Sequence, residues 1–217
     1  MNAAVPSGHG RGEAPRRLPA WQIEPRKIRT LALWCASLLA LATAVAQFVD
    51  YRVYDLRYRT LDSNTHASIF GAISLLASGI AVIAAILLAE RRRTTSSILL
   101  CVGLVALVGL RVARPGAVVA LSVPFDCLVL VILWREGANG SRPEGWLLRA
   151  GCVLLILSFA VHVAELHAFP YGRFSIHSWA YQARCVVKHD AELAAWVLIA
   201  AGLLCAWREP EHPTPPP

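Results

Sequence analysis

The chain carries a short row of polar residues inside an apolar stretch of membrane-spanning length. Ser158, His162 and Glu165 occur within Leu147–Phe169, at the spacing i, i+4, i+7 that places side chains on one face of a helix. A carboxyl group is costly inside a bilayer, so it is expected to face a protein interior or a wet cavity, where such residues commonly have a function. This row is therefore the first candidate for a site.

The spacing within the row decides which chemistry it can do. His162 and Glu165 are three residues apart, so on a helix the two side chains can hydrogen-bond and share one proton near neutral pH. The alternative is that both side chains extend to the membrane interface. His167 lies about 140° from His162 around a helix, so the two imidazoles cannot bind one metal ion. We expect no metal site, no haem and no other cofactor.

A second acid is expected inside the apolar run at 117–134. Asp126 lies near the middle of this run, two residues after Pro124 and directly after Phe125. Proline removes a backbone donor and leaves an upstream carbonyl free, which favours a kink beside the acid and is common where a helix lines a cavity. The alternative is a neutral Asp126 that hydrogen-bonds to a neighbouring helix and serves packing.

Further acids stand where two apolar runs begin. Asp62 precedes the second run and Asp190 the last run, and an Asp at a helix N-terminus caps free amide groups. We expect this capping role for both. Glu192 differs, because it stands four residues before Trp196 and shares a helix face with that indole. It is therefore a further candidate for a chemical role.

The composition indicates the environment of these residues. Of the 217 residues, 56% are hydrophobic and 16% are charged, and the mean hydropathy is +0.51. Too few polar residues remain to cover a soluble globule, which predicts an integral membrane protein. The net charge of +7 comes from basic residues placed between apolar runs. It therefore indicates the lipid bilayer as a partner and argues against nucleic acid.

The six cysteines do not indicate redox chemistry. Five lie inside apolar runs, where a thiol behaves as a small hydrophobic group, and the sequence contains no C-x-x-C. Cys185 is predicted to lie in a loop, without a second loop cysteine to pair with. A thiol oxidoreductase is therefore not expected.

Six apolar runs are long enough to cross a hydrocarbon core, which takes about 20 helical residues. They lie near 30–48, 68–89, 95–111, 117–134, 147–168 and 190–207. The pattern predicts an all-α bundle of about six transmembrane helices over 30–207, between a disordered basic tail at 1–29 and a Pro-rich tail at 208–217. The third run is the shortest, so the alternative is five spans with a re-entrant third run.

The loops set the expected orientation. Lys and Arg together number 13 on the side that holds both tails and 8 on the opposite side. This bias predicts a multi-pass protein of the cell membrane with both termini in the cytoplasm. Four tryptophans agree, because they fall near the cytoplasmic ends of their runs: Trp34, Trp134, Trp146 and Trp207. The tyrosines and most acids fall in the outer half, so any chemistry is expected to face outward.

Three stretches carry a resemblance to known proteins: LDSNTHASIFG after a Tyr- and Arg-rich loop, the helix end ERRR, and HSWAYQARCVVKHDAELAAWVLIAAGLL. Their layout over 30–207 resembles a group of small polytopic membrane proteins from actinobacteria. Some bacterial membrane proteins of this size and hydropathy are terpene cyclases that fold prenylated indoles. The resemblance implies that a lipophilic isoprenoid is cyclised after protonation. It rests on layout and assigns no individual catalytic acid.

That reaction suits the candidate residues. It needs a carboxylic acid that keeps its proton until use, aromatic faces that stabilise cations, and a site without water. The catalytic groups expected in one funnel between the last three runs are Asp126, His162, Glu165 and Glu192. Glu165 or Asp126 would be the acid, with His162 as its partner. The wall that contacts a lipophilic substrate is expected to contain Phe125, Ser158, Phe159 and Trp196.

Two other classes of protein stay open. A small proton-coupled carrier would use the same acids along an outward-opening path, although the chain has no internal repeat and few polar residues in the inner half to line a passage. A helper subunit would carry no chemistry at all. The sequence does not determine the substrate or the oligomeric state.

Overall fold

The computed structural model describes residues 24–55, 69–113, 119–139, 145–168 and 178–208. Within these ranges, the side chains of 111–125, 138–139 and 162–168 are not described. Asp62 and most of the two predicted tails lie outside the described residues.

The described chain consists of six α-helices, which confirms the all-α prediction. They are α1 (Pro25–Arg52), α2 (Ile69–Arg92), α3 (Thr95–Ala113), α4 (Val119–Asn139), α5 (Gly145–Ala168) and α6 (Trp179–Arg208). By length and apolar character, α1, α2 and α6 can cross a membrane. Among the described residues, α3 and α5 contain shorter apolar stretches. The third run forms one continuous helix of 19 residues.

The last helix begins earlier than the sequence predicts. α6 starts at Trp179 and not near residue 190, so Asp190 lies about three turns inside the helix. The prediction that Asp190 caps this helix is therefore wrong, and so is the placement of Cys185 in a loop. The polar residues between 181 and 192 lower the local hydropathy, so this segment resembles a loop in the sequence. They belong to a helix because some of them meet polar partners on neighbouring helices.

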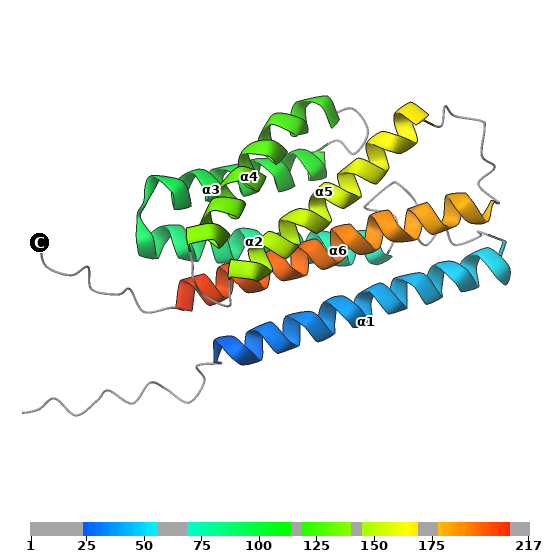
Figure 1. Cartoon of the computed structure of the whole chain (residues 1–217), viewed down its shortest axis with the longest axis horizontal. Coiled ribbons are helices and arrows are strands. Elements are labelled where there is room, and N and C mark those ends of the chain that lie inside the picture. Colours follow the sequence, from blue (N-terminus) through cyan, green and yellow to red (C-terminus); the bar gives the residue numbers. More distant parts are fainter. Residues whose placement is uncertain (1–23, 56–68, 114–118, 140–144, 169–177, 209–217) are drawn as a thin grey trace, which may run out of the picture.

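α6 is the central helix of the bundle. It packs against α1, α2 and α5, while α3 packs against α2 and α4, and α4 packs against α5. α1 and α6 run antiparallel, so the start of α1 and the end of α6 lie at the same end of the bundle (Figure 1). We call this the terminal end, and the end where α1 finishes and α6 begins the distal end.

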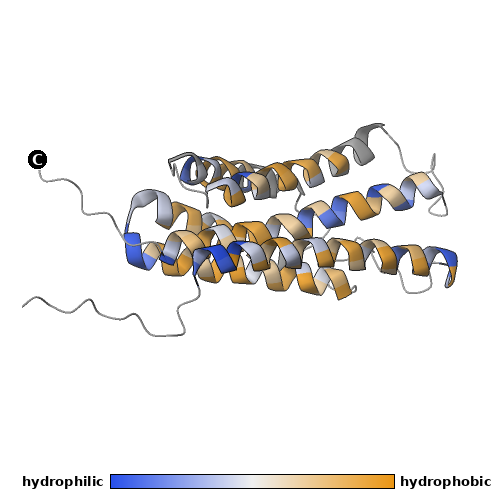
Figure 2. Cartoon of the chain, turned by 60° about the horizontal axis from the view of Figure 1, so that its bottom comes forward, coloured by the Kyte–Doolittle hydropathy of each residue, from blue (hydrophilic) through white to orange (hydrophobic). Residues whose placement is uncertain are grey.

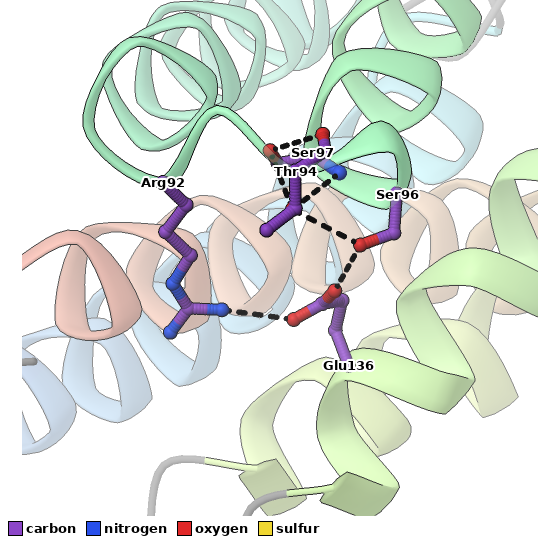
Figure 3. A network of polar contacts seen from close by, with 5 residues as sticks. All are labelled: Arg92, Thr94, Ser96, Ser97 and Glu136. Carbon is purple, nitrogen blue, oxygen red and sulfur yellow. Dashed lines mark hydrogen bonds and ion pairs between the residues drawn. The ribbon is translucent and has the colours of Figure 1, made fainter. Parts of the chain in front are cut away.

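Polar contacts tie the helices together at the terminal end. Thr94 stands before α3 and accepts a hydrogen bond from the Ser97 amide at 3.3 Å, as an N-cap does. The Arg92 guanidinium of α2 lies 3.0 Å from a Glu136 carboxylate oxygen of α4. Ser96 of α3 donates to the other oxygen of the same carboxylate at 3.0 Å (Figure 3). Three helix ends are thereby joined by one carboxylate.

The core between these helices is apolar and closely packed. A Cβ atom on Gly151 of α5 would lie 2.6 Å from Ile199 Cγ1 and 3.1 Å from the Ala195 carbonyl oxygen of α6. A Cβ atom on Gly202 of α6 would lie 2.6 Å from Leu148 Cδ2 of α5. Small residues that let helix backbones approach closely are typical of helix contacts in membranes.

Hydrophobic residues predominate along much of the length of the helices (Figure 2), and many of them are exposed. On α1 the large exposed side chains include Leu31, Trp34, Leu38, Leu41 and Val45. A contiguous apolar surface of this kind marks contact with a membrane or another protein. Together with the three long apolar helices, it is compatible with a membrane protein.

The close approach of α5 and α6 gives a testable prediction. Gly151→Ala should lower the free energy of unfolding by roughly 1–3 kcal/mol, because the added methyl group overpacks the contact with Ile199 and Ala195. Unfolding of the purified protein in detergent measures the change. Gly109→Ala is the matched control, because a Cβ atom there meets nothing within 4 Å. Equal stability of the two variants would contradict the close contact.

Candidate functional site

A row of polar residues lies between α1 and α6 in the distal half of the bundle. Thr43, Gln47 and Asp50 are all buried on α1, at the spacing i, i+4, i+7 that places them on one helix face. On α6, Gln182 is buried and accepts a hydrogen bond from Gln47 Nε2. Asp190 lies about two turns further along α6 and is hydrogen-bonded to Thr43. We call these five residues the α1–α6 polar row.

The Thr43 hydroxyl lies near two possible hydrogen-bond acceptors. Thr43 Oγ1 donates to the Leu39 carbonyl oxygen of its own helix at 2.8 Å. A hydroxyl group has one hydrogen, and a carbonyl oxygen can only accept. The Thr43 hydroxyl can therefore donate its hydrogen either to the Leu39 carbonyl oxygen or to the Asp190 carboxylate.

Two oxygen atoms of the row lack a partner. Gln47 Oε1 and Asp190 Oδ1 are buried and have no hydrogen-bond partner among the described residues. An unsatisfied buried polar atom costs about 1–3 kcal/mol. Both oxygen atoms can accept a hydrogen bond, so a donor group of a bound molecule would satisfy them. The polar row could thus bind one more hydrogen-bond donor.

The next acid of α6 faces a different helix. Glu192 lies 3.4 Å from the Ser74 hydroxyl of α2, and Ser74 and Ser78 are both buried on that helix. One turn further along α6, Trp196 is only 2% exposed and belongs to the apolar core. Its Nε1–H has no hydrogen-bond partner within the described part of the chain. Glu192 and Trp196 lie on successive turns, as their spacing predicts.

Aromatic side chains surround the distal end of the row. The Tyr51 ring meets the Trp179 ring edge-on with the centroids 4.7 Å apart, and Phe48 lies 5.8 Å from the same indole. The Arg52 guanidinium stands 5.7 Å from the centre of the Trp179 ring. This cluster joins the end of α1 to the start of α6.

The other predicted site residues are distributed over α4 and α5. Ser158 is buried on α5, whereas the neighbouring Phe159 is 40% exposed and lies on the outer surface of that helix. Asp126 is half-buried on α4 and takes part in an interaction. Three further predicted residues have a described helical backbone but no described side chain: Phe125, His162 and Glu165.

The structure brings only part of the predicted set together. α5 packs against both α6 and α4, so consecutive helices among the last three are neighbours. Glu192 and Trp196 share α6, but the described partner of Glu192 is on α2. The convergence of Asp126, His162 and Glu165 on Glu192 stays a prediction.

Sequence reasoning missed the α1 side of the site. Thr43, Gln47 and Asp50 have the same i, i+4, i+7 spacing that drew attention to Ser158 and its neighbours. That spacing was the available signal. The spacing alone does not identify the polar partner helix. That helix is α6, whose polar residues face α1 because α6 begins at Trp179 and not near residue 190.

Comparisons with known proteins add no function. The chain matches no protein-family model, no curated protein and no solved structure. Within the described residues, no group of three or more His, Cys, Asp and Glu side chains is placed to hold a metal ion. The site therefore has to be interpreted from its own geometry.

The pair of glutamines allows a direct test of the α1–α6 contact. Gln47→Leu and Gln182→Leu should each destabilise the protein, because each leaves a buried amide without its partner. The double variant should lose less free energy of unfolding than the sum of the two single losses. The difference, which is the coupling energy, should be about 0.6 and at most about 1.7 kcal/mol, as for other hydrogen bonds between membrane helices. Unfolding of all four proteins in detergent measures the coupling, and strictly additive losses would argue against the contact.

Proposed function

We propose that this chain is a polytopic membrane protein whose α6 carboxyl groups carry out acid chemistry on a lipophilic substrate. The observation that carries the proposal is the placement of Asp190 and Glu192. They lie two residues apart on the central helix, and each meets a hydroxyl group of a different neighbour, on α1 and α2 respectively. A carboxyl group that is even partly buried in an apolar bundle lowers stability, so its presence there indicates a functional site.

The membrane part of the proposal has two supports. The bundle exposes large apolar side chains along α1, and α1, α2 and α6 have the length and apolar character of membrane spans. We propose that all six helices cross or enter the bilayer, with the terminal end in the cytoplasm. The Arg-rich connection after α2 lies at that end, as the distribution of positive charge requires.

The chemistry that suits the site best is the acid-initiated cyclisation of an isoprenoid. This reaction begins when a carboxylic acid transfers its proton to a carbon–carbon double bond or an epoxide of the substrate. Asp190 meets the Thr43 hydroxyl, and Glu192 stands one turn from the indole of Trp196. Aromatic faces stabilise the cations that follow, and an apolar environment excludes water. Asp126, His162 and Glu165 stay candidates for the same site.

The core between Asp190 and Glu192 and the terminal end favours an enzyme over a carrier. Toward the terminal end, the largest fully buried side chains among the described residues are apolar and include Leu88, Leu100, Leu133, Leu147 and Leu203. A carrier needs polar groups along a path to both sides of the membrane. The polar site instead lies in the distal half alone, which suits a substrate that enters and leaves from one side or from the lipid.

The amide variants of the two acids test the chemistry. Asp190→Asn and Glu192→Gln keep the shape of each side chain but remove the proton, so loss of the true acid should lower the rate by about 10²–10⁴-fold. Membranes containing each variant would be incubated with prenylated indoles, and cyclised products would be measured by mass spectrometry. Glu90→Gln is the control, because Glu90 is exposed at the terminal end.

The same experiment separates the competing functions. Full activity of both amide variants would remove Asp190 and Glu192 as the acid. Absence of product from the unchanged protein, together with proton flux into liposomes, would identify a carrier. Absence of both product and flux would identify a helper subunit.

The orientation is tested with fusion reporters. A fluorescent protein that matures only in the cytoplasm should fluoresce when fused after Pro217. Alkaline phosphatase, which is active only outside the cytoplasm, should be active when fused after Asp55. The expectation follows from the basic residues near the terminal end, and the opposite pattern of reporter activity would contradict it.

A further inference from the structure

Positive charge is concentrated where α2 meets α3 and where α4 meets α5. The described basic residues at these two connections are Arg91, Arg92, Arg93, Arg135 and Arg149, and the described acidic residues are Glu90 and Glu136. Some of this charge is used within the protein. Arg92 forms an ion pair with Glu136 (Figure 3), and Arg91 donates to the Trp207 carbonyl oxygen of α6.

Arg149 differs from these two arginines because it is held in place without an anion. Its guanidinium lies 5.9 Å from the centre of the Trp134 ring of α4. Its Nε is buried and has no hydrogen-bond partner, and no ion pair with Arg149 occurs among the described residues. A guanidinium group carries five N–H donors in a planar fork that matches a carboxylate or a phosphate. An anion would therefore satisfy the guanidinium, which has no anionic partner among the described residues.

The backbone of α4 makes room for the Arg149 side chain. A Cβ atom on Gly137 would lie 3.1 Å from Arg149 Cγ and 2.7 Å from the Gly145 carbonyl oxygen. The aliphatic part of Arg149 therefore packs on a position of α4 that has no side chain. This contact, together with the Trp134 ring, fixes the direction of the guanidinium.

The first turn of α5 adds to the attraction for an anion. Arg149 is the fifth residue of α5, about 6 Å along the helix axis from its start. The first amide groups of a helix have no partner within the helix, and its N-terminus carries a partial positive charge. The guanidinium and the N-terminus of α5 thus attract an anion at the same end of the bundle.

The neighbouring aromatic rings indicate which anion fits. Trp134 is 46% exposed and Trp146 is 40% exposed, and exposed tryptophans at one end of an apolar bundle are typical of the membrane interface. Lipid phosphates lie at this depth. A soluble phosphate would gain nothing from the apolar rings, whereas the upper part of a lipid tail can pack against them.

We infer that Arg149, with the N-terminus of α5 and the rings of Trp134 and Trp146, binds the phosphate group of an anionic phospholipid. The inference rests on the proposed membrane location but not on the proposed acid chemistry, which concerns the opposite half of the bundle. A bound phosphodiester would accept two hydrogen bonds from the guanidinium fork. The lipid would then hold the ends of α4 and α5 together at the terminal end.

The test uses the full-length protein purified in a neutral detergent. Phosphatidylglycerol and phosphatidylcholine with the same acyl chains would be added, and bound lipid would be counted by native mass spectrometry while the melting temperature is followed. Phosphatidylglycerol should bind preferentially and raise the melting temperature. Arg149→Gln should weaken this binding about tenfold, the effect expected when a charge-assisted hydrogen bond is lost.

Two further variants make the result specific. Arg93→Gln removes the same charge from the α2–α3 connection and should retain most of the binding. Arg149→Lys keeps the charge and the aliphatic part but loses the fork, so its affinity should fall between those of the unchanged protein and Arg149→Gln. It also serves if Arg149→Gln does not fold.

Three results would overturn the inference. Equal losses for Arg93→Gln and Arg149→Gln would show that only the overall charge attracts lipid. An equal rise in melting temperature with inorganic phosphate would identify a site for a soluble anion. Equal binding of the two lipids to the unchanged protein would show that the headgroup charge is not recognised. None of these results bears on the amide variants of Asp190 and Glu192.

Discussion

The need to satisfy polar groups inside an apolar bundle is the constraint on which this structure depends. Neither lipid nor an apolar core supplies hydrogen-bond partners, so the partner must come from another helix. α6 meets this need on two sides, since Asp190 contacts Thr43 of α1 and Glu192 contacts Ser74 of α2. These contacts set which helices flank α6 and also its rotation about its own axis. The central position of α6 follows from them as much as from its apolar residues.

The two ends of the bundle use polar residues in different ways. At the terminal end, Arg92, Glu136 and Ser96 join three helices near the surface, where water can share in their solvation. In the distal half, the polar row is buried between α1 and α6, and two of its oxygen atoms lack a partner among the described residues. A surface network satisfied in this way serves assembly. A buried and incompletely satisfied row is better suited to binding something else, because its unsatisfied atoms lower stability until a partner arrives.

Hydropathy predicts the six helices because each contains enough consecutive apolar residues, but it cannot predict how far a helix continues through polar residues. The first three turns of α6 contain Gln182 and Lys188 and so resemble a loop, although Gln182 meets its partner Gln47 on α1. The site was predictable in part for the same reason. The spacing of Ser158 and His162 indicates a shared face, yet spacing does not say which helix that face meets. Phe159 shows the limit, since an aromatic residue in an apolar run fits a cavity wall and an outer surface equally well.

The pairing of α1 with α6 also has a consequence for biosynthesis. Of the six described helices, α1 leaves the ribosome first and α6 last, and α1 packs mainly against α6. Thr43, Gln47 and Asp50 therefore lack their final partners until α6 has been translated. In the proposed membrane location, α1 is a marginal segment during that interval, and chaperones or proteases can recognise it. Docking of α6 ends this exposure, so the polar residues of the candidate site also determine how long α1 stays exposed.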